Sequence, residues 1–547
     1  MHRKFKSIIS ALAALMLLAG LYLPTARAQQ VATVSIAPLD RLLGDVKYLL
    51  GAANVPELGG MALMMAKQAT NGLDTTRPAG VSVMLEGQMP SVLVFLPLKD
   101  RATFFSALAS MAIEPDDLGN GVYEVIFNGP PIYLKDGGNW LFVGQTEDSF
   151  GDLPSDPSAA LGTLPQRYDI AVSLDLQALP SDLKEMLLAQ MRAGFERGME
   201  EQRGQSDEER AAARRIGEQS IAQIERLLSE TEKFILGWAA EPSNQRTFLD
   251  TGAMFIPGSE LANQVEASKS LTSDFAGLAS SDAAIRLQAS SFIPETDREL
   301  AKGNLQNAIS QIKSALDQNS NMPEEAKDLI LEFAKGMIRV TEKTIDDGKM
   351  DVGASVHLGE SSMTAIMGSS IGDGSELANE LKKFVAGLPQ AAEVPTVKFD
   401  YAKHGDYSLH QMTVPVKIAD PKAKEIFGDS LNIVVATADK SFLISYEPSG
   451  DSQIRSAIDR LGSNRGGKAT PFHLAIEVGQ ILKFAQSIDS HPALDVAINA
   501  IVKYAGKDRV ELTGSIIERG AVYRLSIDEG VLKAIGSAAK AGNGGGF

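Results

Sequence analysis

The chain contains no cysteine among its 547 residues. Disulfide bonds, thiol nucleophiles and cysteine metal sites are therefore excluded. A lipid anchor of the bacterial lipoprotein kind is also excluded, because it is attached to a cysteine. The fold must be stabilised by burial of apolar side chains, and a hydrophobic content of 44% is ample for that.

Long apolar runs are missing except at the start of the chain. A basic segment, residues 2–6, precedes an apolar run over 8–23 and the small-residue triplet Ala26-Arg27-Ala28. This order is typical of a secretory signal peptide over residues 1–28, cleaved after Ala28; an uncleaved membrane anchor is the alternative. Because the run is shorter than the ~20 residues of a helical span, we expect a periplasmic or extracellular protein that does not span the membrane after cleavage.

Positive charge is scarce, since 52 Lys and Arg face 69 Asp and Glu, for a formal charge of −17. The expected signal peptide holds four of the basic residues and no acid, so the remaining chain carries −21. A polyanion of this size repels nucleic acid and anionic lipid surfaces at long range. We therefore expect no nucleic-acid partner, and the simplest role of the charge is solubility.

A hexapeptide, Gly-Ser-Glu-Leu-Ala-Asn, occurs at 258–263 and again at 374–379. The register extends without gaps from 233–264 onto 349–380. The same pattern of expected elements recurs four times, beginning near Val31, Asp169, Ala283 and Phe472. Each copy has a strand, a helical region often opened by proline and an acid, two strands and a closing helix.

Strand-rich inserts are expected at about 120–165 and about 395–447, each between two copies of this pattern. We therefore predict two related halves, 29–275 and 280–541, built from repeated β-αα-β-β-α units. Alternation of apolar and polar residues predicts an α+β fold with antiparallel sheets that helices cover on one face. A glycine-rich tail, 542–547, is expected to be disordered.

Gly368-Ser369-Ser370-Ile371-Gly372 matches the G-x-S-x-G nucleophile elbow, with an expected strand before it and a helix after it. Ser370 would be the nucleophile of a triad. The base would be His410 or His473, and the orienting acid Asp400 or Asp406. The matching position of the other copy is Met254, so a small-residue turn is the preferred interpretation.

Two further motifs are weaker. Residues 462–468 fit G-x-x-x-x-G-K, but Ala469 replaces the hydroxyl residue that reaches Mg²⁺, and a helix is expected before the motif. We interpret this segment as a flexible loop. His404 and His410 flank a tight turn near Asp400 and Asp406, so a two-histidine carboxylate metal site is conceivable. Hairpin histidines without such a role are commoner, so no catalytic, cofactor-binding or metal-binding residue is assigned and no cofactor is expected.

Three features concern packing. Residues 196–215 are dense in charges of both signs and predict the solvent-facing cap of a helical hairpin, with a partner-binding arm as the alternative. Trp140 and Trp238 lie in expected strands and are interpreted as core anchors. Met61, Met64 and Met65 have helical spacing and predict core packing, with an apolar ligand pocket as the alternative.

Phe95-Leu96-Pro97-Leu98-Lys99-Asp100, Tyr133-Leu134-Lys135 and the segment 140–144 resemble exported bacterial proteins of unknown function. In that group a strand ends in a Pro-x-x-Asp helix start, and a later hairpin closes the unit. The resemblance covers about half of the chain and implies no catalytic residue.

Together these features predict an exported, non-catalytic envelope protein that binds or scaffolds a protein partner. One alternative is a periplasmic carrier of an apolar small molecule or lipid, held in a cavity between sheets and Met- and Leu-rich helices. A second alternative is a serine hydrolase that uses Ser370.

Overall fold

The computed structural model describes residues 29–542, apart from 87–88, 127–128, 152, 202–206, 361, 389–394, 416–423, 425 and 429. The expected signal peptide and the tail beyond Gly542 lie outside the described residues. The chain forms two compact units. Unit 1 comprises the chain up to Leu187 with Leu228–Ile256 and Ser526–Ser537; unit 2 comprises Leu188–Leu227, Pro257–Leu525 and the chain from Ala538. The halves at 29–275 and 280–541 stay a prediction.

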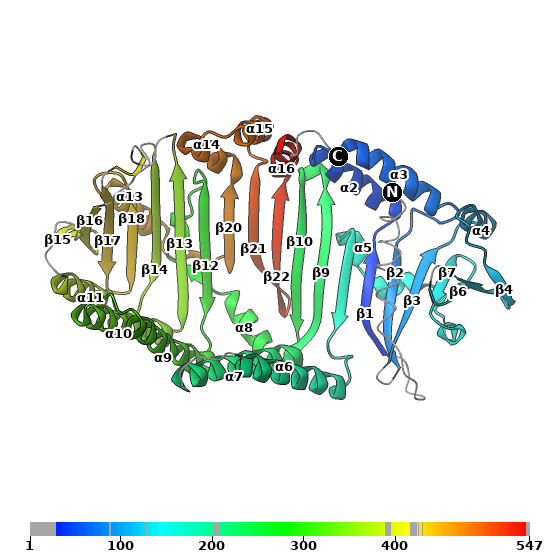
Figure 1. The fold of residues 1–547 in the computed structure, drawn as a ribbon, viewed down its shortest axis with the longest axis horizontal. Coiled ribbons are helices and arrows are strands. Elements are labelled where there is room, and N and C mark those ends of the chain that lie inside the picture. Colours follow the sequence, from blue (N-terminus) through cyan, green and yellow to red (C-terminus); the bar gives the residue numbers. More distant parts are fainter. Residues whose placement is uncertain are drawn as a thin grey trace. The chain divides into compact units, whose positions relative to one another are not determined.

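Unit 1 is built on an antiparallel sheet whose strands pair in the order β4–β5–β6–β7–β3–β2–β1–β8–β9–β10 (Figure 1). The strands are β1 (Gln29–Ile36), β2 (Ala79–Glu86), β3 (Met89–Pro97), β4 (Asp116–Gly119), β5 (Val122–Val125), β6 (Ile132–Asp136), β7 (Trp140–Gly144), β8 (Ile170–Asp175), β9 (Thr231–Glu241) and β10 (Arg246–Phe255). Valine, isoleucine and aromatic residues are frequent in these strands, because such side chains pack well at the half-buried positions of a pleated sheet.

The helices of unit 1 include α2 (Leu39–Ala52), α3 (Pro56–Ala69), α4 (Arg101–Ser110) and α5 (Leu164–Arg167). Helix α4 begins after the Pro-x-x-Asp segment, where the Asp100 carboxylate accepts a hydrogen bond from the Thr103 backbone N–H at 3.0 Å. One core cluster joins Trp140 to Phe95, Phe142 and Leu161, with the Trp140 and Phe95 rings 5.9 Å apart. Trp140 is therefore a core anchor, as predicted.

Unit 2 is built on a second antiparallel arrangement, paired in the order β15–β16–β17–β18–β14–β13–β12–β20–β21. The strands are β12 (Ile285–Phe292), β13 (Lys349–Leu358), β14 (Met363–Ser370), β15 (Thr396–His404), β16 (Tyr407–Pro415), β17 (Ser430–Ala438), β18 (Ser441–Tyr446), β20 (Phe472–Glu477) and β21 (Arg509–Ile517). Strands β15 to β18 lie within 395–447, where a strand-rich insert is expected. A separate short pair joins β11 (Thr272–Ser273) to β19 (Gly467–Lys468).

Helices lie at both ends of the strands of unit 2 (Figure 1). They are α8 (Glu260–Ser268), α9 (Glu295–Gln318), α10 (Glu324–Asp346), α11 (Gly374–Gly387), α13 (Ser452–Asn464), α14 (Val478–Ile488) and α15 (Pro492–Ile501). The repeated hexapeptide opens a helix at both of its positions, but the caps differ. Ser259 caps α8 by accepting from the Ala262 N–H at 3.1 Å, whereas Asp373, outside the hexapeptide, caps α11 by accepting from the Glu376 N–H at 2.8 Å.

The order strand, two helices, two strands, helix occurs four times along the chain. The runs are β1 to α4, β8 to α8, β12 to α11, and β20 to α16 (Glu529–Gly542), with α6 (Ser181–Glu201) and α7 (Asp207–Glu230) in the second run and β22 (Gly520–Asp528) in the fourth. The α+β class with antiparallel sheets is confirmed, while descent of these runs from one repeated sequence stays a prediction. Within the described ranges, no helix is long and apolar enough to cross a membrane.

Candidate functional site

Unit 1 exposes an apolar face of its sheet. Ile170, Val172, Phe234, Leu236 and Leu249 are each 37–39% exposed. The register places Trp238 between Ile170 and Leu249, and Leu236 opposite Val172. Since side chains alternate between the two faces of a strand, these residues share one face. We call this set, with Val34 and Ile36 of β1 in the same rows, the apolar face of unit 1.

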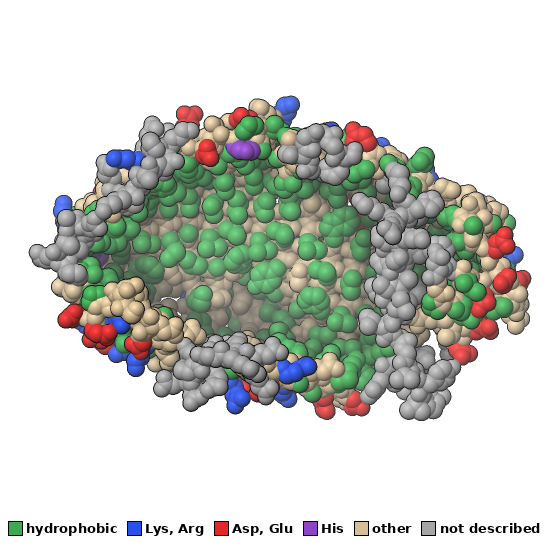
Figure 2. Space-filling view, viewed as in Figure 1, with side chains coloured by type: hydrophobic (Ala, Val, Ile, Leu, Met, Phe, Trp, Pro, Cys, Tyr) green, Lys and Arg blue, Asp and Glu red, His purple; other side chains and the backbone are tan. Residues whose placement is uncertain are grey.

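Unit 2 has a comparable apolar face. Leu287 of β12 pairs with Ala354 of β13 and Leu474 of β20, and Ala354 pairs with Met367 of β14. The apolar face of unit 2 comprises these four residues with Ile285, Val356, Ile476 and Leu512. In Figure 2 the surface over β12, β13, β14 and β20 is hollowed and covered with apolar side chains. Met367 of this face is 37% exposed.

The opposite side of the unit 2 sheet is covered, and it is polar along β12 and at the start of β13. Arg286 and Gln288 of β12 are only 6% and 7% exposed, and Asp351 of β13 is 1% exposed. Farther along the same side the sheet is apolar, because Phe275 and Leu278 pack on Gly353 and Gly368 and join the main core of the unit. No residue named above for the apolar face of unit 2 belongs to that core cluster. Contiguous exposed apolar surface of this kind marks a binding surface.

The buried charges of unit 2 are paired with each other. Glu477 at the end of β20 accepts hydrogen bonds from Arg286 Nη2 and from Arg509 Nε, both at 2.8 Å. Glu511 accepts from the His473 ring at 2.8 Å, and this hydrogen bond holds the Glu511 pKa below its ordinary value. Removing charges from water is tolerated only when such partners are present, which explains the paired arrangement.

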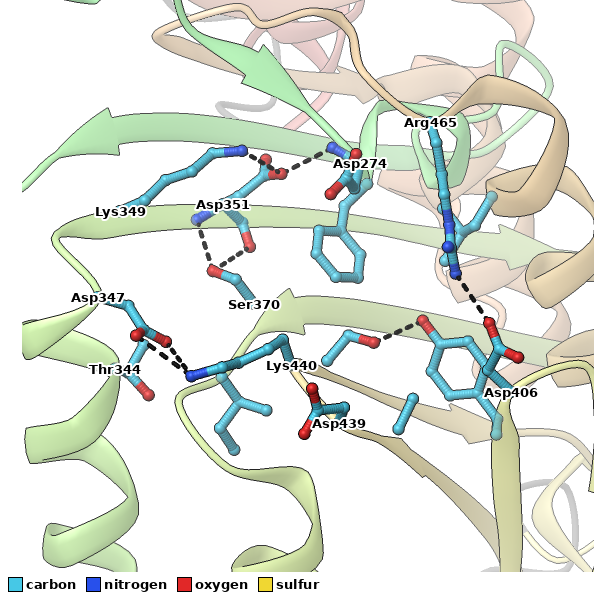
Figure 3. A pocket seen from close by; sticks show the side chains of 16 residues that line it. Asp274, Thr344, Asp347, Lys349, Asp351, Ser370, Asp406, Asp439, Lys440 and Arg465 are labelled. Atoms are coloured by element: carbon cyan, nitrogen blue, oxygen red, sulfur yellow. Dashed lines mark hydrogen bonds and ion pairs between the residues drawn. The ribbon is translucent and has the colours of Figure 1, made fainter.

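A polar pocket of about 660 Å³ lies at one end of β13, β14 and β18 in unit 2 (Figure 3). The Asp351 carboxylate accepts hydrogen bonds from Ser273 and Ser290 hydroxyls at 2.7 Å and from the Asp274 backbone N–H at 2.7 Å. Lys349 lies 3.6 Å from the same carboxylate. The innermost acid of the pocket is therefore fully engaged by protein groups.

The remaining cations of this pocket also face acids. Lys440 Nζ donates to Asp347 at 2.9 Å and to the Gly372 carbonyl at 2.8 Å, and Arg465 lies 3.7 Å from Asp406. Figure 3 shows these pairs around the cavity. The charges of the pocket thus hold the ends of α10 and α13 against the ends of the strands. We interpret them as groups that stabilise the fold rather than as a binding or catalytic site.

Ser370 lines this pocket without a histidine beside it. Its hydroxyl is bonded to the backbone of Asp351, accepting from the N–H at 3.1 Å and donating to the carbonyl at 3.4 Å. His410 lies on β16 and His473 on β20, and each of these strands is three strands from β14. With strands about 4.8 Å apart, each histidine is roughly 14 Å from Ser370. The fold brings His410 within 3.7 Å of the Asp400 carboxylate, but it places Ser370 beside neither histidine, so no triad is formed.

Of the residues proposed for a metal site, His410 and Asp400 lie together, with 3.7 Å between the ring Nδ1 and the carboxylate, whereas His404 and Asp406 face other partners. His404 Nε2 lies 2.8 Å from Asp459, and Asp406 faces Arg465. His410 is buried and accepts from the Asp400 backbone N–H at 3.1 Å, and this burial lowers the His410 pKa. Among the described residues, no group of three or more His, Asp or Glu is placed to hold a metal ion.

Three other sequence features have clear positions. Residues 462–464 are the last turn of α13 and 467–468 form β19, so only 465–466 lie outside a helix or strand; the Gly466 N–H donates to Asp274 at 2.9 Å. In the charged segment, Arg214 pairs with Glu196 at 3.2 Å across α7 and α6, as a helical hairpin requires, although 202–206 lie outside the described residues. Trp238, expected as a core anchor, instead lies half-buried on the apolar face of unit 1, its indole N–H bonded to Thr247 at 2.9 Å.

Comparisons of the chain with models of known protein families, with curated proteins and with solved structures find no match. The site is therefore interpreted from its own geometry.

Proposed function

We propose that this protein is a non-catalytic carrier in the cell envelope whose apolar sheet faces bind the acyl chain of a lipid or a similar long apolar molecule. The observation that carries the proposal is the alignment of apolar rows in both units, which are exposed at five positions of unit 1 and at Met367 in unit 2. In unit 2 these rows lie opposite the buried charges of β12, β13 and β20. Exposing such rows to water is unfavourable by about 25 cal/mol for each Å², so an apolar ligand that covers them gains binding energy.

The chemistry of the face favours an acyl chain. Its side chains are mainly aliphatic or aromatic, although Thr247 and Thr251 lie in the same rows of β10. The Trp238 indole N–H is already bonded to the Thr247 hydroxyl. The backbone N–H and C=O groups of these strands are hydrogen-bonded to the neighbouring strands of the sheet. A ten-residue strand such as β10 is about 33 Å long, whereas one acyl chain spans half of a hydrocarbon core of ~30 Å. A chain molecule without hydrogen-bonding groups therefore fits along the strands.

The test is a titration of the full chain with cis-parinaric acid, a fluorescent fatty acid whose emission rises in apolar surroundings. We expect saturable binding, weakened about tenfold by Leu236→Gln combined with Val172→Thr, because these changes remove apolar contact area. The matched control is Ile535→Gln, which changes an exposed apolar side chain outside the face. We expect the control to bind the probe like the unmodified chain.

Equal binding by the face variant and the control would contradict the proposal, as would the absence of saturable binding. Native mass spectrometry of protein purified from its own envelope gives a second readout. A small apolar mass that is lost on denaturation supports the carrier. An added mass of several kilodaltons without lipid would favour the protein-binding scaffold, which is the function that the sequence alone predicts.

A further inference from the structure

A cleft of about 440 Å³ lies between α2 and α3 in unit 1. Asp40, Leu43, Gly44 and Lys47 line it from α2, spaced as one face of a helix. Helix α3 contributes Leu63 and Lys67. Lys99, which follows β3, completes a set of three lysines at the cleft. We call Lys47, Lys67 and Lys99 the lysine cluster.

Lys99 is held at the cleft by the backbone. Gly72 also lines the cleft, has φ +89° and accepts hydrogen bonds from both the Lys99 N–H at 3.0 Å and the Asp100 N–H at 2.9 Å. A side chain at this position would be strained and would meet the Phe104 backbone at 2.4 Å. The three lysines therefore converge through fixed elements.

The lysine cluster is unusual for so acidic a protein. No ion pair or side-chain hydrogen bond joins these lysines to another described residue, and Asp40 is the one acid that lines the cleft. The nearby Asp74 carboxylate attracts Lys99 electrostatically, but its hydrogen bonds come from the Thr76 N–H at 3.1 Å and the Thr76 hydroxyl at 2.6 Å. By contrast, Lys302, Lys343 and Lys382 each lie 2.5–2.6 Å from a carboxylate. Three such cations around a concave site attract an anion.

An exposed apolar side chain adjoins the cluster. Met64 precedes Lys67 by three positions, so it lies one turn away on the same side of α3, and it is 67% exposed. A free inorganic anion would gain nothing from contact with the Met64 side chain. A lipid could contact both Met64 and the lysines, because it carries apolar groups and a phosphate. The overall negative charge of the chain opposes this binding only weakly, because charges beyond a Debye length of ~8 Å are screened.

We propose that the lysine cluster binds the phosphate of an anionic lipid headgroup. The inference deepens the proposed function and rests on it for the lipid source, since a carrier of acyl chains also meets headgroups. The phosphate chemistry itself is independent of the apolar faces, so the two proposals can fail separately.

The experiment compares the full chain with a triple variant, Lys47→Gln, Lys67→Gln and Lys99→Gln. Flotation with vesicles of phosphatidylglycerol and phosphatidylcholine, and with phosphatidylcholine alone, measures lipid binding. Titration with glycerol 3-phosphate measures the phosphate group without the acyl chains. The control replaces three exposed lysines of unit 2 by glutamine, Lys313, Lys398 and Lys503, for the same change in net charge.

We expect the cluster variant to bind phosphatidylglycerol vesicles about a hundredfold more weakly, at roughly fivefold for each lysine near an anionic surface. The control should bind like the unmodified chain. Equal loss in both variants would overturn the proposal, because net charge alone would then explain the effect. Loss of glycerol 3-phosphate binding with unchanged vesicle binding would assign the cleft to free phosphates and overturn the lipid source.

Binding of cis-parinaric acid separates the two proposals. The cluster variant should retain it, because the apolar faces are unchanged. If the unmodified chain binds phosphatidylglycerol through the cluster but never binds parinaric acid, the headgroup site stands and the carrier function fails.

Discussion

The two units expose similar apolar faces but stabilise the opposite, covered side of their sheets by different means. In unit 1, the covered side of β8, β9 and β10 carries Ala171, Ala239 and Phe248, packed with Tyr168. In unit 2, the covered side of β12, β13 and β20 carries Arg286, Asp351 and Glu477. Each side also contains the other kind of group, since Asp250 is buried beside Tyr168 in unit 1 and Phe275 packs on Gly353 in unit 2. The difference is that the buried charges of β12, β13 and β20 are more numerous, so this part of unit 2 depends more on partners for buried charges.

The comparison shows that an exposed apolar face can be maintained in two ways. Buried ion pairs add little net stability but are strongly destabilising when one partner is lost. They therefore fix which strands can lie side by side in unit 2 without using the apolar side chains of those strands. In unit 1, a few small and aromatic residues are enough to pack the covered side of the sheet. The larger aliphatic residues therefore lie on the exposed side.

The largest expected effect comes from breaking the charged side of unit 2. Glu477→Gln removes the carboxylate that lies 2.8 Å from both Arg286 Nη2 and Arg509 Nε while keeping the size of the side chain. Because Arg286 is buried, we expect the free energy of unfolding to fall by about 3–5 kcal/mol. Urea unfolding followed by hydrogen exchange of β12, β13 and β20 measures this change.

Glu299→Gln is the matched control, since Glu299 is exposed and lies 3.6 Å from Lys302. We expect this change to cost less than about 1 kcal/mol. A similar small cost for Glu477→Gln would show that the buried pairs do not stabilise unit 2, and the contrast between the units would be lost.

The sequence predicts the elements of this fold better than it predicts their faces. Alternation, Pro-x-x-Asp and glycine turns give the α+β class and the order of strands and helices, because these signals are local. Ile170, Val172 and Phe234 alternate like the buried side of a sheet, yet they are exposed. Which side is covered depends on remote segments, such as Phe275, whose carbonyl packs against Gly353.

The candidate sites are equally hard to predict for the same reason. Met64 has the spacing of a core methionine but is exposed, because no element packs on that side of α3 strongly enough to cover it. Lys47, Lys67 and Lys99 are far apart in the sequence and form no motif, and only the packing of α2, α3 and the end of β3 brings them to one cleft. Ser370 has a motif, but its neighbours in the fold are backbone groups.

An intermediate effect is expected from pH, with opposite signs in the two units. In unit 1, Asp45 of α2 is buried near Asp169, and Arg41 Nε lies 2.9 Å from Asp169 and 3.8 Å from Asp45. Burial, with the charge of Asp169, raises the Asp45 pKa from 3.8 to about 6. The folded state therefore keeps a proton on Asp45 that the unfolded chain releases, and the contribution of Asp45 to the stability of unit 1 is lost as pH rises from about 4 to 6.

Asp45→Asn should remove this dependence and raise the free energy of unfolding at pH 7 by on the order of 2 kcal/mol. Asp40→Asn, on the same helix, is the control for loss of one charge. In unit 2 the lowered pKa of Glu511 has the opposite sign, since its contribution is lost as pH falls. Hydrogen exchange at pH 4.5 and 7 in each unit measures both trends, and the same trend in both units would contradict the assignment.

The smallest expected effect is a difference in stability between substitutions on the two sides of one strand pair in unit 1. Phe248 of β10 is buried against Tyr168, with the ring centroids 6.3 Å apart, whereas Phe234 of the paired strand β9 lies on the apolar face. Phe248→Leu should lower the free energy of unfolding by about 1–1.5 kcal/mol, because a packed ring is lost, and Phe234→Leu by less than about 0.5 kcal/mol. Equal costs would mean that the apolar face is part of a core rather than a surface. Only Phe234→Leu should weaken binding of cis-parinaric acid, since that ring faces the ligand and the Phe248 ring does not.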